Sequence, residues 1–391
     1  MPPDGRPREP TTSAAAPPTM LGHWRVGLAG WLERVAGLAF LLPAVATVLL
    51  LSIFPLILSL YLAFSRLRLV RGGYDINFVG LANFRKLLFG SEQRHFLGVF
   101  APLSPAAWLV FLAAVALVAF LLWGYLRGRT RSALGFFSRL VTALILTTGF
   151  YFILASLSGG GRPGTVIVTV VYVAVGLAIQ YAIGLILALL TTQRLPGQRL
   201  FRVIFLLPMM ITPVGIAYMF WMLADTGKGP LKPIWNLIGL AGTSWVNDPW
   251  GARWAVMIGD TWQWTPLMFI VLLAALEGQP LELIEAALMD GATRWQIFRH
   301  ITLPQLLPVS LTLILIRLIE GFKIIDLPNV LTNGGPGTAT ESLTLMAYFA
   351  WRTLDLGGAM AMAVSLLVVV MFLAVTLVNL MPGRTAGGGA S

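Results

Sequence analysis

The sequence predicts an all-α, polytopic membrane protein with about eight transmembrane helices. Of its 391 residues, 57% are apolar and only 11% are charged, and the mean hydropathy is +0.82, whereas about 25% of the residues of an ordinary soluble domain are charged. One globular core cannot bury this much apolar surface, so much of it must face the lipid bilayer. Cysteine is absent, which excludes disulfides, thiol nucleophiles and zinc-thiolate sites. The composition therefore excludes a water-soluble enzyme.

The predicted spans are long apolar runs, and about 20 apolar residues are enough to cross a bilayer. The first run is too long and begins too far from Met1 for a cleaved signal peptide. Between it and the second run we expect an outer loop over 65–103. Residues 1–22, rich in proline and small polar residues, predict a disordered tail, and 383–391 a C-terminal tail. The runs cover about 36–64, 106–126, 140–157, 166–192, 203–224, 254–276, 305–326 and 357–381.

The orientation follows from the distribution of Lys and Arg. With the N-terminus inside, the inner segments carry 14 of these residues and the outer segments 11, six of which lie in the one long outer segment. Because short loops dominate this rule, the sequence predicts both termini on the cytoplasmic side. The net charge of +11 is then a topology signal, so we expect no nucleic-acid partner. Three scattered histidines (His23, His95 and His300) predict no metal site, and nothing indicates a cofactor.

Residues 277–304, between the sixth and seventh runs, predict two short helices joined by a glycine turn. Pro280 can open the first helix, and Gly291 is placed to end it in a left-handed conformation. Thr293 and Gln296 have the capping-box spacing that starts a second helix. From the residues alone, this loop could plug the bundle or contact a partner. The predicted apolar residues are Leu281, Ile284, Ala287 and Leu288 in the first helix and Trp295, Phe298 and Ile301 in the second, and Pro304 and Pro308 mark the entry of the seventh span.

The same loop resembles the signature of the permease subunits of ABC importers. Glu285-Ala286-Ala287, three residues, Gly291, nine residues, Ile301, one residue and Leu303-Pro304 match every defined position of that motif. In that family the short helix docks as a coupling helix into a cleft of the ATPase subunit. The resemblance implies that Glu285 faces the ATPase, that the two alanines allow close packing and that Gly291 permits the turn. The candidate coupling residues are Glu285, Ala286, Ala287, Asp290, Gly291, Ile301, Leu303 and Pro304.

Further stretches resemble the sugar and glycerol-3-phosphate branch of these permeases, typified by the larger maltose-type subunit. The resemblance covers about 30–90 and 165–382. It implies a six-helix permease core, in which 165–382 follows the first span, and a helix pair inserted at 104–160. We expect that pair to be peripheral and dispensable for the translocation path. The stretches are Phe78 to Phe84, Leu207-Pro208 with Pro213, Trp262 to Pro266, and Leu331 to Pro336.

The resemblance also implies the partners of the chain. These are a second permease subunit in a heterodimer, two ATPase subunits and an extracytoplasmic solute-binding protein, in the bacterial inner membrane. The chain lacks the phosphate-binding motif G-x-x-x-x-G-K-[ST], so ATP hydrolysis is expected on another subunit and no catalytic residue is assigned here.

Charged residues inside the seventh span are candidates for a substrate path. Arg317, Glu320, Lys323 and Asp326 follow at intervals of three, so neighbours can pair across one helical turn. Arg317 lies about 20 Å from Pro304 along a helix, near the bilayer centre, where an unpaired charge costs at least about 2.5 kcal/mol. These residues must therefore face the bundle interior. Whether they bind solute or only neutralise one another is left open.

Aromatic and amide side chains suit a sugar, whose apolar C–H faces are ringed by hydroxyls. The alternative interpretation of the aromatic residues is that they anchor helix ends at the membrane interface. A competing function is an ion-coupled secondary transporter, in which Arg317 and Glu320 serve a proton path. The solute is not identified, because a disaccharide, an oligosaccharide, a polyol or a glycerophosphate would suit the polar stripe. The aromatic and amide candidates for contact with the sugar are Tyr218, Trp262, Gln263 and Trp264.

Overall fold

The structure is a computed structural model and describes residues 40–127, 133–193, 197–240, 242 and 244–380. The predicted tails, 1–22 and 383–391, lie outside these ranges. The chain divides into two units, one ending at Ser59 and the other beginning at Leu60. The π-helix η1 (Leu49–Ile53) lies in the first unit and leads into α2 (Phe54–Ala63), whose last four residues belong to the second unit.

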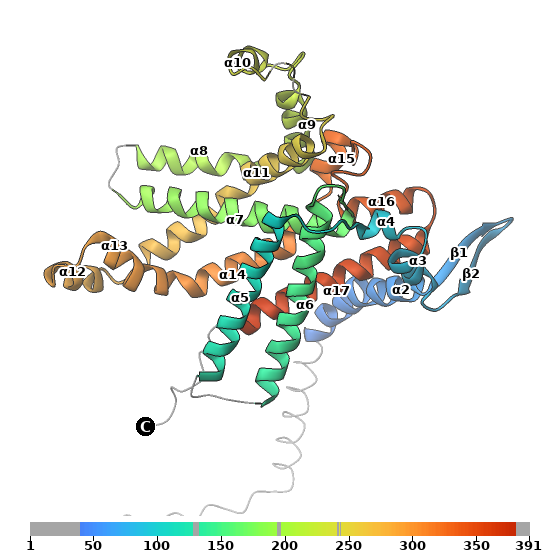
Figure 1. The fold of residues 1–391 in the computed structure, drawn as a ribbon, viewed down its shortest axis with the longest axis horizontal. Helices are drawn as coiled ribbons and strands as arrows, with labels where there is room; N and C mark the ends of the chain where they lie inside the picture. Colours follow the sequence, from blue (N-terminus) through green and yellow to red (C-terminus); the bar gives the residue numbers. More distant parts are fainter. Residues whose placement is uncertain (1–39, 128–132, 194–196, 241, 243, 381–391) are drawn as a thin grey trace, which may run out of the picture. The chain divides into compact units, whose positions relative to one another are not determined.

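Helices make up nearly all of the second unit (Figure 1). Its elements after α2 are β1 (Ser65–Val70), β2 (Gly73–Phe78), α3 (Ala82–Phe89), α4 (Gln93–Phe96), β3 (Gly98–Val99), α5 (Pro105–Arg127), α6 (Ala133–Leu157), β4 (Arg162–Pro163), α7 (Thr165–Thr191), α8 (Gln198–Met210), α9 (Pro213–Ala224), α10 (Lys232–Leu237), α11 (Pro249–Glu277), α12 (Leu281–Met289), α13 (Arg294–Ile297), the π-helix η2 (Phe298–Thr302), α14 (Leu303–Gly321), α15 (Asp326–Thr332), α16 (Leu343–Arg352) and α17 (Leu356–Leu380).

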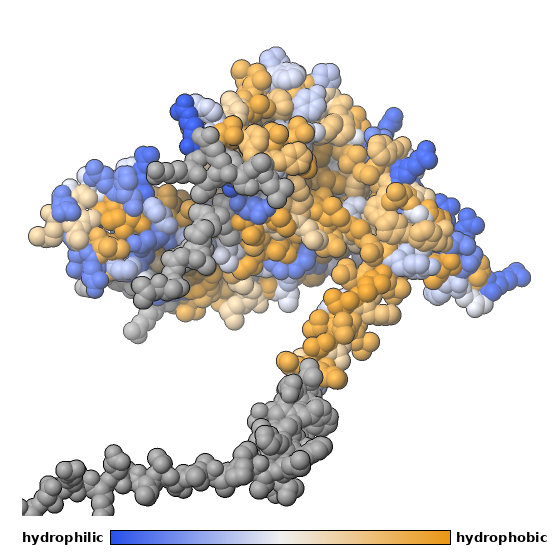
Figure 2. All heavy atoms as spheres, turned by 90° about the horizontal axis from the view of Figure 1, so that it is seen from below, coloured by the Kyte–Doolittle hydropathy of each residue, from blue (hydrophilic) through white to orange (hydrophobic). Residues whose placement is uncertain are grey.

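Seven helices among the described residues are long and apolar enough to cross a membrane, and a bent pair makes up to eight. This agrees with the predicted all-α membrane class. On the face drawn in Figure 2, hydrophobic residues cover the middle and hydrophilic residues gather toward the ends. The seven are Phe40–Ala63, Pro105–Gly124, Gly135–Leu157, Thr165–Thr191, Pro249–Glu277, Arg294–Gly321 and Leu356–Asn379.

The expected span at 203–224 is broken. α8 and α9 meet at an angle of 97°, so the helix predicted over these residues is not continuous. The residue before a proline is disfavoured in helical conformation, and Thr212, which precedes Pro213, is extended with φ −64° and ψ 143°. The Thr212 hydroxyl then accepts a hydrogen bond from the Gly215 amide at 3.4 Å and caps α9.

The region predicted as a loop over 65–103 contains regular structure. β1 and β2 form an antiparallel hairpin with Ser65 opposite Phe78 and Val70 opposite Gly73. Polar and apolar residues alternate along β1, and a two-residue turn ending at Gly72, whose φ is +99°, connects the strands. Both features are typical of a hairpin. A second small sheet joins β3 to β4, in antiparallel register.

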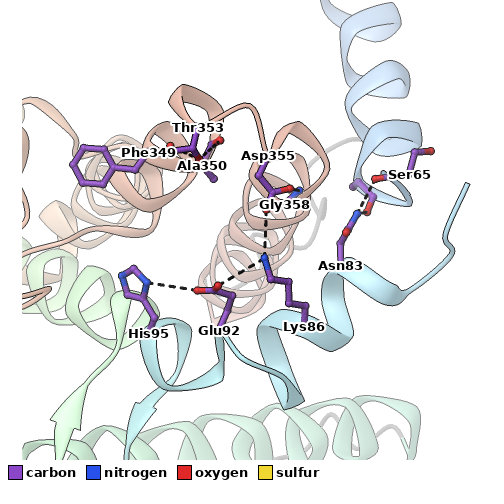
Figure 3. Close-up of polar contacts among 11 residues, drawn as sticks. Ser65, Asn83, Lys86, Glu92, His95, Phe349, Ala350, Thr353, Asp355 and Gly358 are labelled. Atoms are coloured by element: carbon purple, nitrogen blue, oxygen red, sulfur yellow. Dashed lines mark hydrogen bonds and ion pairs between the residues drawn. The ribbon is translucent and has the colours of Figure 1, made fainter. Parts of the chain in front are cut away.

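Polar contacts fasten α3 to the chain on either side of it (Figure 3). The Asn83 amide donates to the carbonyl oxygens of Ala63 and Ser65, both at 2.9 Å, and so satisfies acceptors at the end of α2 that the helix leaves unpaired. The Lys86 amine lies 3.7 Å from the Glu92 carboxylate and 3.4 Å from that of Asp355, which precedes α17. The stretch that resembles sugar permeases, 78–84, therefore contains a helix cap.

His95 on α4 makes a further polar contact. Its Nε2 lies 2.8 Å from a carboxylate oxygen of Glu341, which is 5% exposed, and its Nδ1 lies 3.8 Å from Glu92. The hydrogen bond to Glu341, supported by the charge of Glu92, raises the pKa of His95 above its ordinary value of 6.5. The contact ties α4 to the loop before α16.

α11 is the central helix of the second unit, since 56% of the residues in its most apolar 18-residue stretch are buried. It packs closely along α7, where a Cβ on Gly184 would lie 2.4 Å from the Cβ of Met268. Glycine is therefore required at position 184 for this approach. Apolar residues of both helices pack with Leu313 of α14 in one buried cluster.

α5 and α6, the pair that the sequence predicts as an insertion, pack on each other through aromatic rings. Tyr151 on α6 meets Phe111 and Trp108 on α5, with ring centroids 5.5 and 6.3 Å apart. In the most apolar 18-residue stretch of α5 no residue is buried, and in that of α6 only 11% of the residues are buried. These helices expose most of their surface, as helices that contact lipid do.

Candidate functional site

A buried network joins three spans near the middle of the second unit. The Arg317 guanidinium on α14 pairs with the Asp260 carboxylate on α11, and the Arg317 side chain is 4% and that of Asp260 9% exposed. The Gln180 amide on α7 donates to Asp260 at 2.8 Å, and its oxygen accepts from Arg317 Nε at 2.8 Å. Every member is thus hydrogen-bonded to the other two, which a buried polar group needs to offset its desolvation.

Trp264 covers this network on one side. The Arg317 guanidinium lies over its indole ring, 4.8 Å from the centroid, a favourable arrangement of a cation on an aromatic face. Arg317, Asp260 and Trp264 line a pocket of about 160 Å³, between the spans. The other lining residues are Pro213, Gln263, Glu320, Lys323, Ile324, Ile325, Asp326 and Leu327.

The pocket contains six of the eight residues predicted for the substrate path. The exceptions are Tyr218 and Trp262. Tyr218 is 58% exposed and lies outside the lining, while Trp262 points to another side of α11, where it packs edge-on against Phe220 at 5.8 Å. Side chains two positions apart on an α-helix point in directions about 200° apart. Trp262 and Trp264 therefore cannot line the same face of α11.

The predicted ladder of charges along one helix is wrong. α14 ends at Gly321, and Asp326 is the first residue of α15, so the four residues do not form one row. Glu320 pairs with Lys323 at 2.7 Å, as the three-residue spacing predicts, but Arg317 pairs with Asp260 on another helix. The cross-helix partner of Arg317 could not be derived from its own segment.

Gln180 was missed by sequence reasoning. It is the one amide in the apolar run 166–191 and is fully buried. A single amide inside an otherwise apolar span is itself a signal, because a polar group in the bilayer needs a partner.

The loop after α11 forms the predicted helix, glycine turn and helix. Gly291 has φ +78°; its amide donates to the Leu288 carbonyl at 3.0 Å, and the Ala292 amide to the Ala287 carbonyl at 2.9 Å. These two bonds are the Schellman arrangement that ends a helix. The first helix begins at Leu281, with Pro280 as its N-cap, one residue later than predicted. The capping box of Thr293 with Gln296 is present.

The second part of this loop differs in its apolar face. Ile297 is the buried residue, at 8% exposure, while Trp295 is 67% exposed and stacks on Phe298 with centroids 5.6 Å apart. η2 follows and ends directly before Leu303-Pro304. A proline clashes with the carbonyl four residues earlier in an α-helix, and the wider π turn accommodates Pro304.

α12 exposes an apolar surface. It has no buried residue; Met289 is 88%, Leu281 64% and Leu288 53% exposed, with Glu285 exposed beside them. Exposed apolar side chains of this size are typical of a surface that contacts a partner. The helix is held in place by its neighbours, since the Gln279 amide donates to the Thr302 carbonyl at 3.2 Å and Arg202 pairs with Glu277.

Comparison with known families defines the class of the protein. A family model described as binding-protein-dependent transport system inner membrane component matches residues 180–386, more than half of the chain, and includes both the buried network and the α12 loop. The chain belongs to this family of multi-pass membrane permeases.

Several similar proteins are permeases of sugar transport systems. The trehalose/maltose transport system permease protein of Thermococcus litoralis is 36% identical over 217 residues, covering 56% of this chain and 73% of that protein. The maltodextrin transport system permease protein of Bacillus subtilis is 30% identical over 179 residues, 44% of this chain and 41% of that protein. These relatives are permease subunits and not enzymes, and they give no support to an ion-coupled secondary transporter.

The fold is also found in a solved transporter. A chain of the bacterial alginate ABC transporter, in complex with an alginate pentasaccharide-bound periplasmic protein, aligns with a TM-score of 0.51 at 20% identity, covering 70% of this chain and 93% of that one. The similarity extends the shared architecture beyond the matched family region.

Proposed function

We propose that the chain is the permease subunit of an ATP-driven importer for a neutral carbohydrate or a related polyol, which passes the pocket lined by Arg317, Asp260 and Trp264. The observation that carries this proposal is the composition of that pocket. It combines one indole face with fixed hydrogen-bonding groups, and its two cations, Arg317 and Lys323, are outnumbered by three carboxylates.

This charge balance favours a sugar over a glycerophosphate. A phosphate ester needs an excess of positive charge, whereas hydroxyl groups can both donate to the carboxylates and accept from the guanidinium. The sugar relatives support the same class of solute. Glu320, with 37% of its side chain exposed, and Lys323, with 58%, are available for such contacts.

The exposed α12 is proposed to couple this path to a separate ATPase subunit. Glu285 and the apolar residues beside it form its contact surface, and the Gly291 turn with the η2 segment transmits displacement to α14. The proposed ATPase contact, together with the distribution of Lys and Arg, puts α12 and both chain termini on the cytoplasmic side. The assembly would contain a second permease subunit, two ATPase subunits and the solute-binding protein.

The test is uptake into proteoliposomes of the assembled importer, with maltose, trehalose and glycerol 3-phosphate as probes. Trp264→Ala should lower sugar uptake at least tenfold and leave assembly and basal ATPase activity intact. Trp254→Ala, on α11 outside the pocket and 41% exposed, is the matched control and should transport normally. Equal uptake by both variants would contradict the path, and uptake driven by a proton gradient without ATP would contradict the class.

A further inference from the structure

A second pocket, of about 540 Å³, lies at the N-terminal end of α11, opposite to the α12 loop. It is separate from the pocket around Arg317 and shares no residue with it. Its walls come from the end of α6, from β4, from the start of α11 and from the loop before α16. The lining residues used below are Arg162, Asp248, Trp250, Arg253 and Ala339.

Arg253 is the unusual member of this lining. It is only 6% exposed, its Nε donates to the Ala339 carbonyl at 2.7 Å, and its guanidinium lies over the Trp250 ring at 4.9 Å. No carboxylate among the described residues comes within ion-pair distance of it. Arg317, the comparably buried arginine, has Asp260 as a direct partner, whereas the hydrogen bond and the ring contact of Arg253 are both with neutral groups. A buried charge without a counter-charge is strongly unfavourable.

In the rest of the lining, Asp248 attracts Arg253 from beyond ion-pair distance and forms no ion pair with it. Asp248 accepts from the Gly251 amide at 2.6 Å as the N-cap of α11, and Arg162, exposed on β4, adds a second cation. The pocket therefore carries a net positive charge beside one indole ring, which is 44% exposed. Its size is that of an ordinary small-ligand site, about 300–1,000 Å³.

We propose that this pocket binds a carboxylate, which pairs with Arg253 and Arg162 while the group that carries it packs on Trp250. A planar guanidinium fixed at Nε by a carbonyl presents its remaining N–H groups to both oxygens of a carboxylate. The carboxylate has two possible sources, an acidic saccharide or an acidic side chain of a docked solute-binding protein. The second source rests on the proposed function, which puts this end of α11 on the outer side.

The experiment measures two affinities on the assembled importer in lipid nanodiscs. One is for D-glucuronate, with D-glucose as the neutral matched probe; the other is for the solute-binding protein. The variants are Arg253→Gln and Arg162→Gln, and the control is Arg71→Gln, an exposed arginine in the hairpin turn. Arg162 is exposed, so its variant tests the site even if Arg253→Gln fails to fold.

Two results support the site and identify its source. Glucuronate binding that glucose does not show, weakened at least fivefold by Arg162→Gln and abolished by Arg253→Gln, identifies an acidic saccharide. No glucuronate binding, with binding-protein affinity lowered at least fivefold by Arg162→Gln and not by Arg71→Gln, identifies a side chain of that protein. Unchanged affinity for both in Arg162→Gln overturns the proposal. Sugar uptake measured in parallel reports separately on the proposed function.

Discussion

Arg317 and Asp260 form an ion pair across the interface of α14 and α11, although they are 57 positions apart in the chain. Gln180 bridges both partners from α7. The three spans are thus held together by a closed set of hydrogen bonds inside the membrane, where water cannot replace a lost partner.

Breaking this pair from one side should destabilise the protein, because the remaining charge stays buried. Arg317→Met or Asp260→Asn is expected to cost about 3–5 kcal/mol, and the double variant to regain much of this loss. Thermal melting of the assembled transporter in detergent measures the effect. The control is Glu320→Gln with Lys323→Met, a partly exposed pair worth at most about 1 kcal/mol. Additive losses at Arg317 and Asp260 would show that the two residues do not act as a pair.

Gly291 should be needed for the shape of the α12 turn. Its φ of +78° costs a residue with a Cβ about 1–2 kcal/mol, although no atom lies near enough to clash. Gly291→Val should therefore assemble less well and hydrolyse ATP without matching uptake. Gly149→Ala, in the middle of α6 with open space around it, should retain the normal ratio of ATP hydrolysed to sugar transported. A normal ratio in both variants would remove the coupling role of the turn.

The contact of His95 with Glu341 should make stability depend on pH. The pKa of His95 is raised in the folded protein, mainly by its hydrogen bond to Glu341, so the stabilisation is fully present below the unfolded value of 6.5 and is lost as pH rises through the folded value. The melting temperature should fall from pH 6 to pH 8.5 more in the native protein than in His95→Gln. Parallel curves for the two proteins would contradict the contribution.

Asn83 should stabilise the junction between α2 and α3. Asn83→Ala leaves the carbonyls of Ala63 and Ser65 without their donor, at a cost of about 1–3 kcal/mol. Asn77→Ala removes only an exposed amide that bonds Asp75 at 2.7 Å and should change stability by less than about 0.5 kcal/mol. Chemical denaturation in mixed micelles, followed by near-UV circular dichroism, compares them. An equal effect of the two changes would argue against the cap.

The membrane-spanning helices were accessible from the sequence because a run of apolar residues is a local property. The Gly291 turn and the capping box were equally local, since each depends on residues within a few positions of one another. The hairpin at β1 and β2 was missed even though its alternation and glycine turn stand in the sequence, because the segment was treated only as the connection between two spans.

The buried network could not be predicted in the same way. The spacing of Arg317 and Glu320 gives neighbours on one helix, but the partner of Arg317 depends on the axial register of α7, α11 and α14. That register is fixed by close packing such as Gly184 on Met268, which involves residues far apart in the chain. The break between α8 and α9 was signalled by Pro208 and Pro213, whose effect on backbone direction outweighs the continuous hydropathy of 203–224.

The 97° bend between α8 and α9 has a mechanical consequence. α7 and α11 are in such close contact that they should move as one rigid body. The Arg317 network attaches α14 to that body. A polypeptide joint at Ile211 and Thr212, which lacks helical hydrogen bonds across it, can change its angle at little cost. We expect the conformational change that opens and closes the translocation path to change the backbone angle at this joint. The buried network would then move as one unit with the spans that it connects.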